Sequence, residues 1–169
     1  MLDVLRRLRR TGLLTEPLPS PAADAPPAAA LQARLREVFG RALAIRHVDA
    51  GSCNGCELEI HALNNPYYNL EGVGIRFVAS PRHADLLLVT GPVAANMEEA
   101  LRRTWEATPD PRLVVAVGEC AACGGIFGQN YACRGAVSTV LPVDAVVPGC
   151  PPSPVALLEG ILAAVGRRG

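Results

Sequence analysis

The sequence predicts an α/β protein with an open, parallel, flavodoxin-like sheet and helices on both faces. Three observations support this fold class. Short apolar runs of strand length alternate with segments of helical periodicity, as in parallel sheets built from strand–helix–strand units. Half of the residues are hydrophobic but only 4% are aromatic, so the predicted core is aliphatic. The 169 residues have the length of one domain with a sizeable core.

Two segments precede the predicted sheet. Residues 2–12 combine leucines with four arginines, which fits either an interfacial helix that contacts lipid headgroups or a membrane subunit, or a solvated terminus. Residues 15–30 are rich in proline and alanine, which predicts a linker or an extended arm. We therefore divide the chain into a basic N-terminal segment with a Pro/Ala-rich arm, residues 1–30, and an α/β domain, residues 31–169, which opens with a helix.

Five strands are expected in this domain. The third is apolar at four consecutive positions, which is typical of a strand that is buried on both faces. In chain order, the strands are expected at 45–50, Ile75–Ala79, Asp85–Thr90, Leu113–Val117 and Ala145–Val147.

Three further helices are expected, over 54–64, Asn96–Glu106 and Pro154–Val165. The first ends ahead of Pro66, because proline and the residue before it resist helix continuation. Residues at helical spacing mark the face that each helix turns inward. They are Cys56, Ile60 and Leu63 in the first helix, Met97, Ala100, Leu101 and Trp105 in the second, and Leu158, Ile161, Leu162 and Val165 in the third.

Charge and hydropathy exclude several classes of function. Sixteen basic and sixteen acidic residues cancel, so no global field favours nucleic acid. No apolar run is long enough for a membrane span, and no long apolar stretch of an export signal follows Arg6-Arg7. We therefore expect a cytoplasmic chain, in which six cysteines indicate metal binding or catalysis rather than disulfides.

Four cysteines follow predicted strands. Cys53 and Cys56 come after the first strand, Cys120 after the fourth and Cys150 after the fifth. The carboxyl ends of parallel strands meet at one edge of the sheet, where such folds place their ligands. The four thiols are therefore expected to converge there, although nearly a hundred positions separate the first from the last.

The spacing of these cysteines favours an iron–sulfur cluster. Cys53 and Cys56 form a C-x-x-C turn, whereas Cys120 and Cys150 are single residues in glycine-rich turns whose amides can donate to cluster sulfurs. Structural zinc sites usually combine two close pairs, and only one pair is present here. A redox-active pair at Cys53 and Cys56 would leave the other two unexplained. Both of these remain as alternatives.

Several neighbouring residues carry two interpretations. Cys123 and Cys133 are taken as small buried residues beside the site, although Cys123 also forms a C-x-x-C with Cys120. Glu57 and Glu59 lie where a helix dipole favours carboxylates without any function. Glu119 is either structural or an influence on the cluster or on proton traffic. Arg82 and His83 either contact a partner or shape a surface turn.

Four motifs resemble one known family. They are DAGSCNGCELEI at Asp49–Ile60, SPRHAD at Ser80–Asp85, GECA at Gly118–Ala121 with Gly124-Gly125 after it, and PGCPPSP at Pro148–Pro154. Over roughly residues 44–165 the chain resembles the small electron-transfer subunit of energy-converting nickel–iron hydrogenases of the formate hydrogenlyase type. That subunit is homologous to the 20 kDa subunit of respiratory complex I.

The resemblance implies a cofactor, a ligand set and partners. It implies that Cys53, Cys56, Cys120 and Cys150 hold one 4Fe–4S cluster. It further implies a large hydrogenase or 49 kDa-type subunit next to that cluster, a ferredoxin-like iron–sulfur subunit, and a peripheral position on the cytoplasmic face of the inner membrane. The N-terminal segment would contact a membrane subunit. The chain would then be a subunit of an oxidoreductase without a catalytic site of its own.

The spacing of the first cysteine pair indicates the type of complex to which the chain belongs. Complex I subunits typically have adjacent cysteines there, and this chain has the C-x-x-C of hydrogenases. A hydrogenase-like complex is therefore expected. The alternatives are a quinone-reducing, complex I-type subunit and a metal-bearing scaffold that transfers no electrons.

Overall fold

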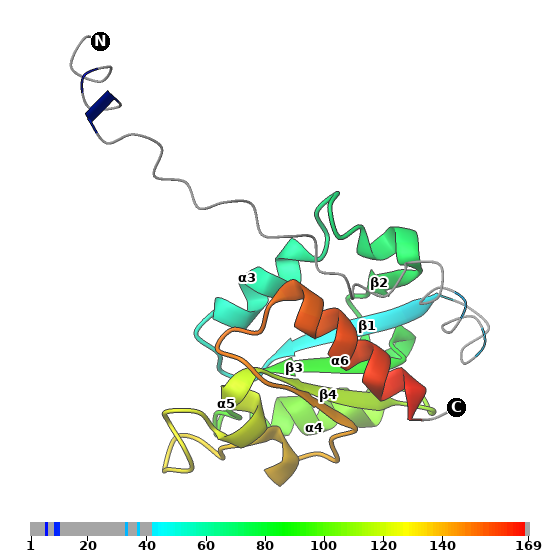
Figure 1. The fold of residues 1–169 in the computed structure, drawn as a ribbon. Helices are drawn as coiled ribbons and strands as arrows, with labels where there is room; N and C mark the ends of the chain where they lie inside the picture. Colours follow the sequence, from blue (N-terminus) through cyan, green and yellow to red (C-terminus); the bar gives the residue numbers. More distant parts are fainter. Residues whose placement is uncertain (1–5, 7–8, 11–32, 34–36, 38–41, 168–169) are drawn as a thin grey trace.

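All five predicted strands are present and run parallel in one sheet (Figure 1). They are β1 (Leu43–Asp49), β2 (Ile75–Phe77), β3 (Leu86–Thr90), β4 (Leu113–Val117) and β5 (Ala145–Val147). Their order is β2-β1-β3-β4-β5, which is the order of a flavodoxin-like sheet. The predicted fold class is therefore confirmed.

The computed structural model describes residues 6, 9–10, 33, 37 and 42–167. Residues 6, 9 and 10 are helical, as are residues 33 and 37. The rest of the basic segment, the Pro/Ala-rich arm and the remainder of the helix expected after residue 31 lie outside the described residues.

Helices cover both faces of the sheet, with α3 and α6 on one side and α4 and α5 on the other (Figure 1). The helices are α3 (Gly55–Ala62), α4 (Glu98–Ala107), α5 (Gly118–Cys123) and α6 (Pro154–Gly166). Three short 3-10 helices, η1 (Leu70–Val73), η2 (Pro81–His83) and η3 (Val137–Thr139), join them. Among the described residues, no helix has both the length and the apolar character that crossing a membrane requires.

The core is split by the sheet into two apolar layers. Strand β3 shows this most clearly, because all five of its residues are buried. Leu86 and Leu88 pack in the layer under α3 and α6, whereas Leu87 and Val89 pack in the layer under α4 and α5. Alternate side chains of a strand point to opposite faces, so a central strand needs apolar residues throughout.

The inward faces of two helices differ from the prediction. In α4, Leu101 is fully buried and Trp105 packs partly buried beside it, but Ala100 is exposed. In α6, Ile161 and Val165 are buried as expected, whereas Leu158 and Leu162 are only partly buried. Leu157 and Ala164, which the prediction omitted, are fully buried instead. The inward stripe of α6 is therefore rotated relative to the predicted one.

Element boundaries were close, with one omission. Strands β4 and β5 have the predicted bounds, whereas β1 begins two residues earlier and β2 ends two residues earlier than expected. Helix α5 was predicted as a turn, because six residues are too few to show helical periodicity. This short helix carries Cys120.

Candidate metal centre

The four predicted ligand cysteines lie around the carboxyl edge of the sheet. Cys53 is in the loop after β1, Cys56 in the first turn of α3, Cys120 in α5 directly after β4, and Cys150 between β5 and α6. Figure 1 shows α3 and α5 starting close together where β1 and β4 end. Parallel topology thus brings three distant loops to one place.

Electrostatic coupling shows that the four thiols are neighbours. The pKa of Cys56 is raised to about 11, first by burial and then by negative charge on Glu57, Cys120, Cys53 and Cys150, in that order of size. Burial also raises the pKa of Cys120, followed by the effects of Cys150 and Cys53. Cys56 therefore feels the charge of the other three thiols, and Cys120 feels the charge of Cys150 and Cys53.

Two glycines leave room for cysteine sulfurs. A Cβ atom on Gly118 would lie 2.7 Å from Cys56 Sγ, and one on Gly125 would lie 2.8 Å from Cys120 Sγ. Both residues also have positive φ angles, +83° and +54°, which side chains disfavour. Only glycine satisfies both conditions, so the backbone of these turns is shaped around the thiols.

Glu119 joins the loops that carry Cys120 and Cys150. Its backbone N–H donates to the Gly149 carbonyl at 2.9 Å, and its Oε1 accepts from the Gly149 N–H at 3.2 Å. This reciprocal pair of hydrogen bonds supports the structural interpretation of Glu119. It holds two of the cysteine loops at a constant separation.

Asp49 organises the turn that carries Cys53, a role that sequence reasoning missed. Its Oδ1 accepts from the N–H groups of Gly51 and Ser52, both at 2.8 Å, and Ser52 Oγ accepts from the Asn54 N–H at 3.1 Å. Aspartate and serine commonly accept hydrogen bonds from the backbone two or three residues ahead in turns. The Asp-Ala-Gly-Ser sequence carried that signal.

The two remaining cysteines differ from each other. Cys133 is buried at 7% exposure, and its backbone N–H and carbonyl pair with Asn130, as expected for a small core residue. Cys123 is exposed at the end of α5, so the prediction that it is a buried small residue is wrong. Its thiol donates to the Glu119 carbonyl at 3.2 Å. Helix α5 buries Gly118 and Ala121, and Cys123, two positions after Ala121, falls on the opposite side of the helix.

The charged residues near the site fall into two groups. Arg82 and His83 are exposed in η2, whose first turn is capped by Ser80 Oγ accepting from the Arg82 N–H at 3.4 Å, which fits a surface turn. Glu57 is buried instead, with 7% exposure, and lies beside His47 of β1. A carboxylate that is present only for the helix dipole would remain in solvent.

Within the part of the chain that the structure describes, no group of three or more His, Cys, Asp or Glu side chains is placed to hold a metal ion.

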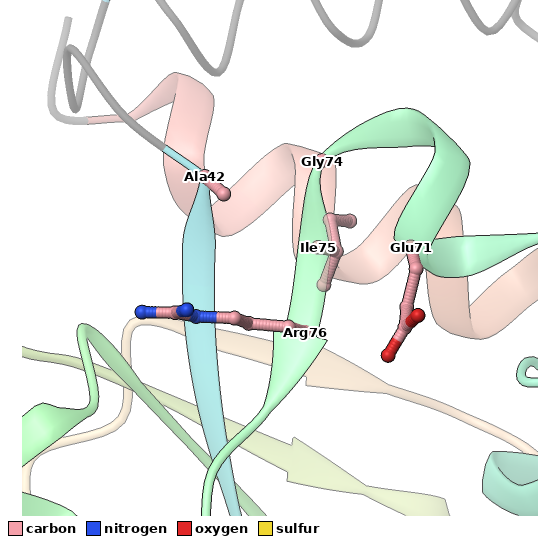
Figure 2. A pocket seen from close by; sticks show the side chains of 5 residues that line it. All are labelled: Ala42, Glu71, Gly74, Ile75 and Arg76. Carbon is pink, nitrogen blue, oxygen red and sulfur yellow. The ribbon is translucent and has the colours of Figure 1, made fainter.

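A surface pocket lies at the opposite end of the sheet, near the start of β1 and β2. Ala42, Glu71, Gly74, Ile75 and Arg76 line this pocket of about 260 Å³. Figure 2 shows that the Glu71 and Arg76 side chains point in different directions instead of converging. The pocket therefore lacks the converging polar groups of a binding site.

Comparison with known proteins adds three close relatives. A probable membrane-bound hydrogenase subunit (mbhJ) of Pyrococcus furiosus is 44% identical over 135 residues, 80% of this chain and 81% of that protein. Formate hydrogenlyase subunit 7 of Escherichia coli is 43% identical over 82% of this chain, which spans 54% of that subunit's length. An NADH-quinone oxidoreductase subunit of Desulfovibrio desulfuricans is 44% identical over 73% of this chain and 67% of that protein.

A solved structure and a family match agree with these relatives. A chain in the structure of the membrane-bound sulfane sulfur reductase, an archaeal respiratory membrane complex, superposes with a TM-score of 0.67 and 32% identity. The match covers 84% of this chain and 76% of that one. Residues 53–164, from the first candidate ligand through most of α6, match the family described as NADH ubiquinone oxidoreductase, 20 kDa subunit. The chain belongs to this 20 kDa-subunit family of oxidoreductase complexes.

Proposed function

We propose that this chain is the electron-transfer subunit of a membrane-associated, hydrogenase-like oxidoreductase related to complex I, and that Cys53, Cys56, Cys120 and Cys150 hold one 4Fe–4S cluster. The observation that carries the proposal is the convergence of these thiols from three loops at the carboxyl edge of the sheet. When bound, the cluster supplies a one-electron carrier.

The protein contributes shape and environment to that carrier. Gly118 and Gly125 keep the backbone clear of Cys56 and Cys120, and the bonds between Glu119 and Gly149 tie two of the loops together. The raised pKa values of Cys56 and Cys120 reflect burial, which together with nearby charge influences the potential of an iron–sulfur centre. Because thiolates bind the metal, loading the site releases protons.

The parent complex is proposed to be a hydrogenase-like one. The relatives above include hydrogenase, formate hydrogenlyase and NADH-quinone oxidoreductase subunits at similar identity, so identity alone does not separate them. The C-x-x-C spacing of Cys53 and Cys56 favours the hydrogenase type. The alternative is a quinone-reducing, complex I-type subunit, which the sequence of the large partner distinguishes: two C-x-x-C motifs there indicate a hydrogenase.

Exposed apolar side chains beside the cysteines support a covering partner. They are Leu58 on α3, at 63% exposure, and Ile126, Phe127 and Tyr131 in the loop after α5, at 94%, 52% and 97%. Apolar groups gathered at one edge mark an interaction surface. We propose that a large subunit covers this edge, and that the chain lies peripherally on the cytoplasmic face of the inner membrane, with a ferredoxin-like subunit as a further partner.

The ligand set is tested by anaerobic reconstitution of the full chain with iron and sulfide. We expect a brown protein with a paramagnetic signal after reduction, loss of the cluster spectrum in Cys120→Ser and in Cys150→Ser, and a normal spectrum in the matched control Cys133→Ser. A colourless protein with stoichiometric zinc would refute electron transfer. Intact clusters in both ligand variants would refute the assignment of ligands.

A further inference from the structure

Three polar side chains interrupt the apolar core next to the cysteines. His47 lies on the same face of β1 as the buried Leu43 and Ile45, because strand side chains alternate. Thr90 ends β3 and is fully buried, and Glu57 of α3 is 7% exposed. Charged residues are rarely buried without a partner. The clustering of these three polar side chains at one place in the core therefore requires a physical explanation.

Contacts join the three side chains across three elements. The Thr90 hydroxyl donates to the Val48 carbonyl at 3.5 Å, and its oxygen lies within hydrogen-bond distance of His47 Nε2, at 3.0 Å. The same His47 Nε2 lies 3.6 Å from Glu57 Oε1. A polar link therefore runs from the end of β3 through β1 to the first turn of α3.

Glu57 depends on this link. Neither of its carboxylate oxygens has a hydrogen-bond partner among the described residues, and His47 is the ionisable side chain that contacts it. Burying a carboxylate without hydrogen bonds is unfavourable. The dipole of α3 would favour an exposed carboxylate at this position just as well. The helix dipole alone therefore does not account for the burial of Glu57, and the contact with His47 is the polar contact that the described residues offer it.

The link reaches the helix turn that carries a candidate ligand. Cys56 directly precedes Glu57, and its Sγ lies in the space left by Gly118. The helix has no side-chain cap at its start, since the Asn54 side chain makes no capping hydrogen bond. Ile60 and Leu63 anchor the later turns in the core, but they leave the first turn to other contacts. A small rotation of that turn would move Cys56 away from the other thiols.

We propose that Glu57 and His47 are positioning residues that hold the first turn of α3 against β1 and thereby keep Cys56 in place beside Cys53, Cys120 and Cys150. The consequence for a cluster rests on the proposed function. The contact itself, and its effect on the Cys56 thiol, do not require a cluster.

The first test uses the metal-free, reduced full chain. Iodoacetamide alkylation of each cysteine is followed by mass spectrometry, with the exposed Cys123 as an internal reference. We expect Glu57→Leu, which fills the same space without a polar group, to raise the Cys56 rate several-fold while leaving Cys123 unchanged, because local opening governs access to a partly buried thiol. Glu57→Gln also removes the negative charge that raises the Cys56 pKa, but it keeps a polar group opposite His47, so its Cys56 rate should rise less than that of Glu57→Leu.

A double-mutant cycle tests whether one contact is responsible. His47→Leu breaks the same contact from β1, so it should raise the Cys56 rate as Glu57→Leu does. The double variant should then be no faster than Glu57→Leu alone, because both substitutions break the same contact. Glu106→Gln, an exposed acid on α4, serves as a control that should match the unmodified chain. His47→Leu also keeps the test open if Glu57→Leu does not fold.

The second test uses the chain reconstituted with iron and sulfide. The g-values of the reduced cluster should change in Glu57→Leu and His47→Leu and should be restored in Glu57→Gln. A residue that only stabilised the fold would lower the yield of folded protein without changing this spectrum.

Two results would overturn the proposal: wild-type alkylation rates in both leucine variants, or a Glu57→Gln variant that behaves as Glu57→Leu does. If the unmodified chain takes up no cluster but the alkylation pattern is as expected, the proposed function fails and the positioning contact stands.

Discussion

Gly118 and Cys56 approach each other so closely that no side chain fits between them. A Cβ atom at Gly118 would be 2.7 Å from Cys56 Sγ and 3.3 Å from the Gly149 carbonyl oxygen, at a φ of +83°. Gly74 has nearly the same φ, +87°, but has open space where its Cβ would lie. Comparing substitutions at Gly74 and Gly118 therefore distinguishes the effect of backbone strain from that of steric exclusion.

We expect Gly74→Ala to lower the free energy of unfolding by about 1 kcal/mol, the usual effect of a positive φ. Gly118→Ala should lower it by roughly 1–3 kcal/mol more, because the added methyl group also displaces Cys56 or Gly149. Urea denaturation measures both, and iron content after reconstitution should fall only in Gly118→Ala. Equal losses of stability in the two variants would show that space at Gly118 is not limiting.

His47 makes stability depend on pH. Burial lowers its pKa below 6.5, and the negative charges of Glu57 and Asp49 oppose that shift only in part. The unfolded chain therefore takes up a proton near pH 6.5 before the folded chain does. The contribution of His47 to stability is complete above pH 6.5 and is lost as pH falls through the lowered pKa.

Urea unfolding of the metal-free chain between pH 7.5 and pH 5 (about the range where histidine titrates) checks this prediction. We expect the free energy of unfolding to fall with pH, and His47→Gln to fall less steeply. If the free energy of unfolding of His47→Gln falls with pH as steeply as that of the unmodified chain, His47 is not the source of the pH dependence.

At the scale of elements, Arg112 joins the end of α4 to the start of β4. Its guanidinium stacks on the Trp105 ring, with Cζ 3.8 Å from the ring centroid, and its Nη1 donates to the Trp105 carbonyl at 2.8 Å and the Thr108 carbonyl at 3.2 Å. The Trp105 carbonyl also accepts from the N–H of Thr108, the residue that caps the helix, at 3.2 Å. Arg112 therefore closes the helix and also orients the Trp105 side chain against the core.

Removing the Arg112 side chain should lower the stability of the protein measurably. We expect Arg112→Ala to reduce the free energy of unfolding by about 1–2 kcal/mol, since it removes carbonyl hydrogen bonds and a cation–π contact. Arg103→Ala breaks only an exposed ion pair with Glu99 on the same helix and should change stability by less than about 0.5 kcal/mol. Thermal or urea denaturation distinguishes the two, and similar losses would contradict the special role of Arg112.

The boundaries of strands were predicted correctly where turn residues flank the strand. Pro111 and Gly118 flank β4, and Pro148 follows β5, so both strands have the expected bounds. Helix α5 was missed, because its six residues are too few to show helical periodicity.

At the scale of the whole molecule, the cysteine edge carries an apolar rim that suits a protein partner. Ile126 and Tyr131 are almost fully exposed in the loop after α5, yet this loop is ordered by the hydrogen bonds of Cys133 with Asn130 and by the ion pair of Arg134 with Glu98 at 2.6 Å. The apolar side chains are thus held outward by a structured loop.

We expect Ile126→Ser combined with Tyr131→Ser to weaken copurification of the chain with the proposed large partner while leaving the unfolding midpoint unchanged, because exposed side chains add little to stability. Tyr67→Ser, which changes an aromatic residue of 87% exposure beyond the far end of α3, is the matched control and should copurify normally. Normal recovery of the partner with the double variant would remove this loop from the interface.

The sequence by itself determined the sheet, its order and the edge at which four cysteines gather. Apolar runs and turn residues are local signals, and parallel topology alone brings the ends of β1, β4 and β5 together. The tertiary structure decided the rest: burial of Glu57 against His47, the tie between Glu119 and Gly149, and the outward position of Cys123. These depend on side chains from elements far apart in the chain, whose packing no local pattern encodes.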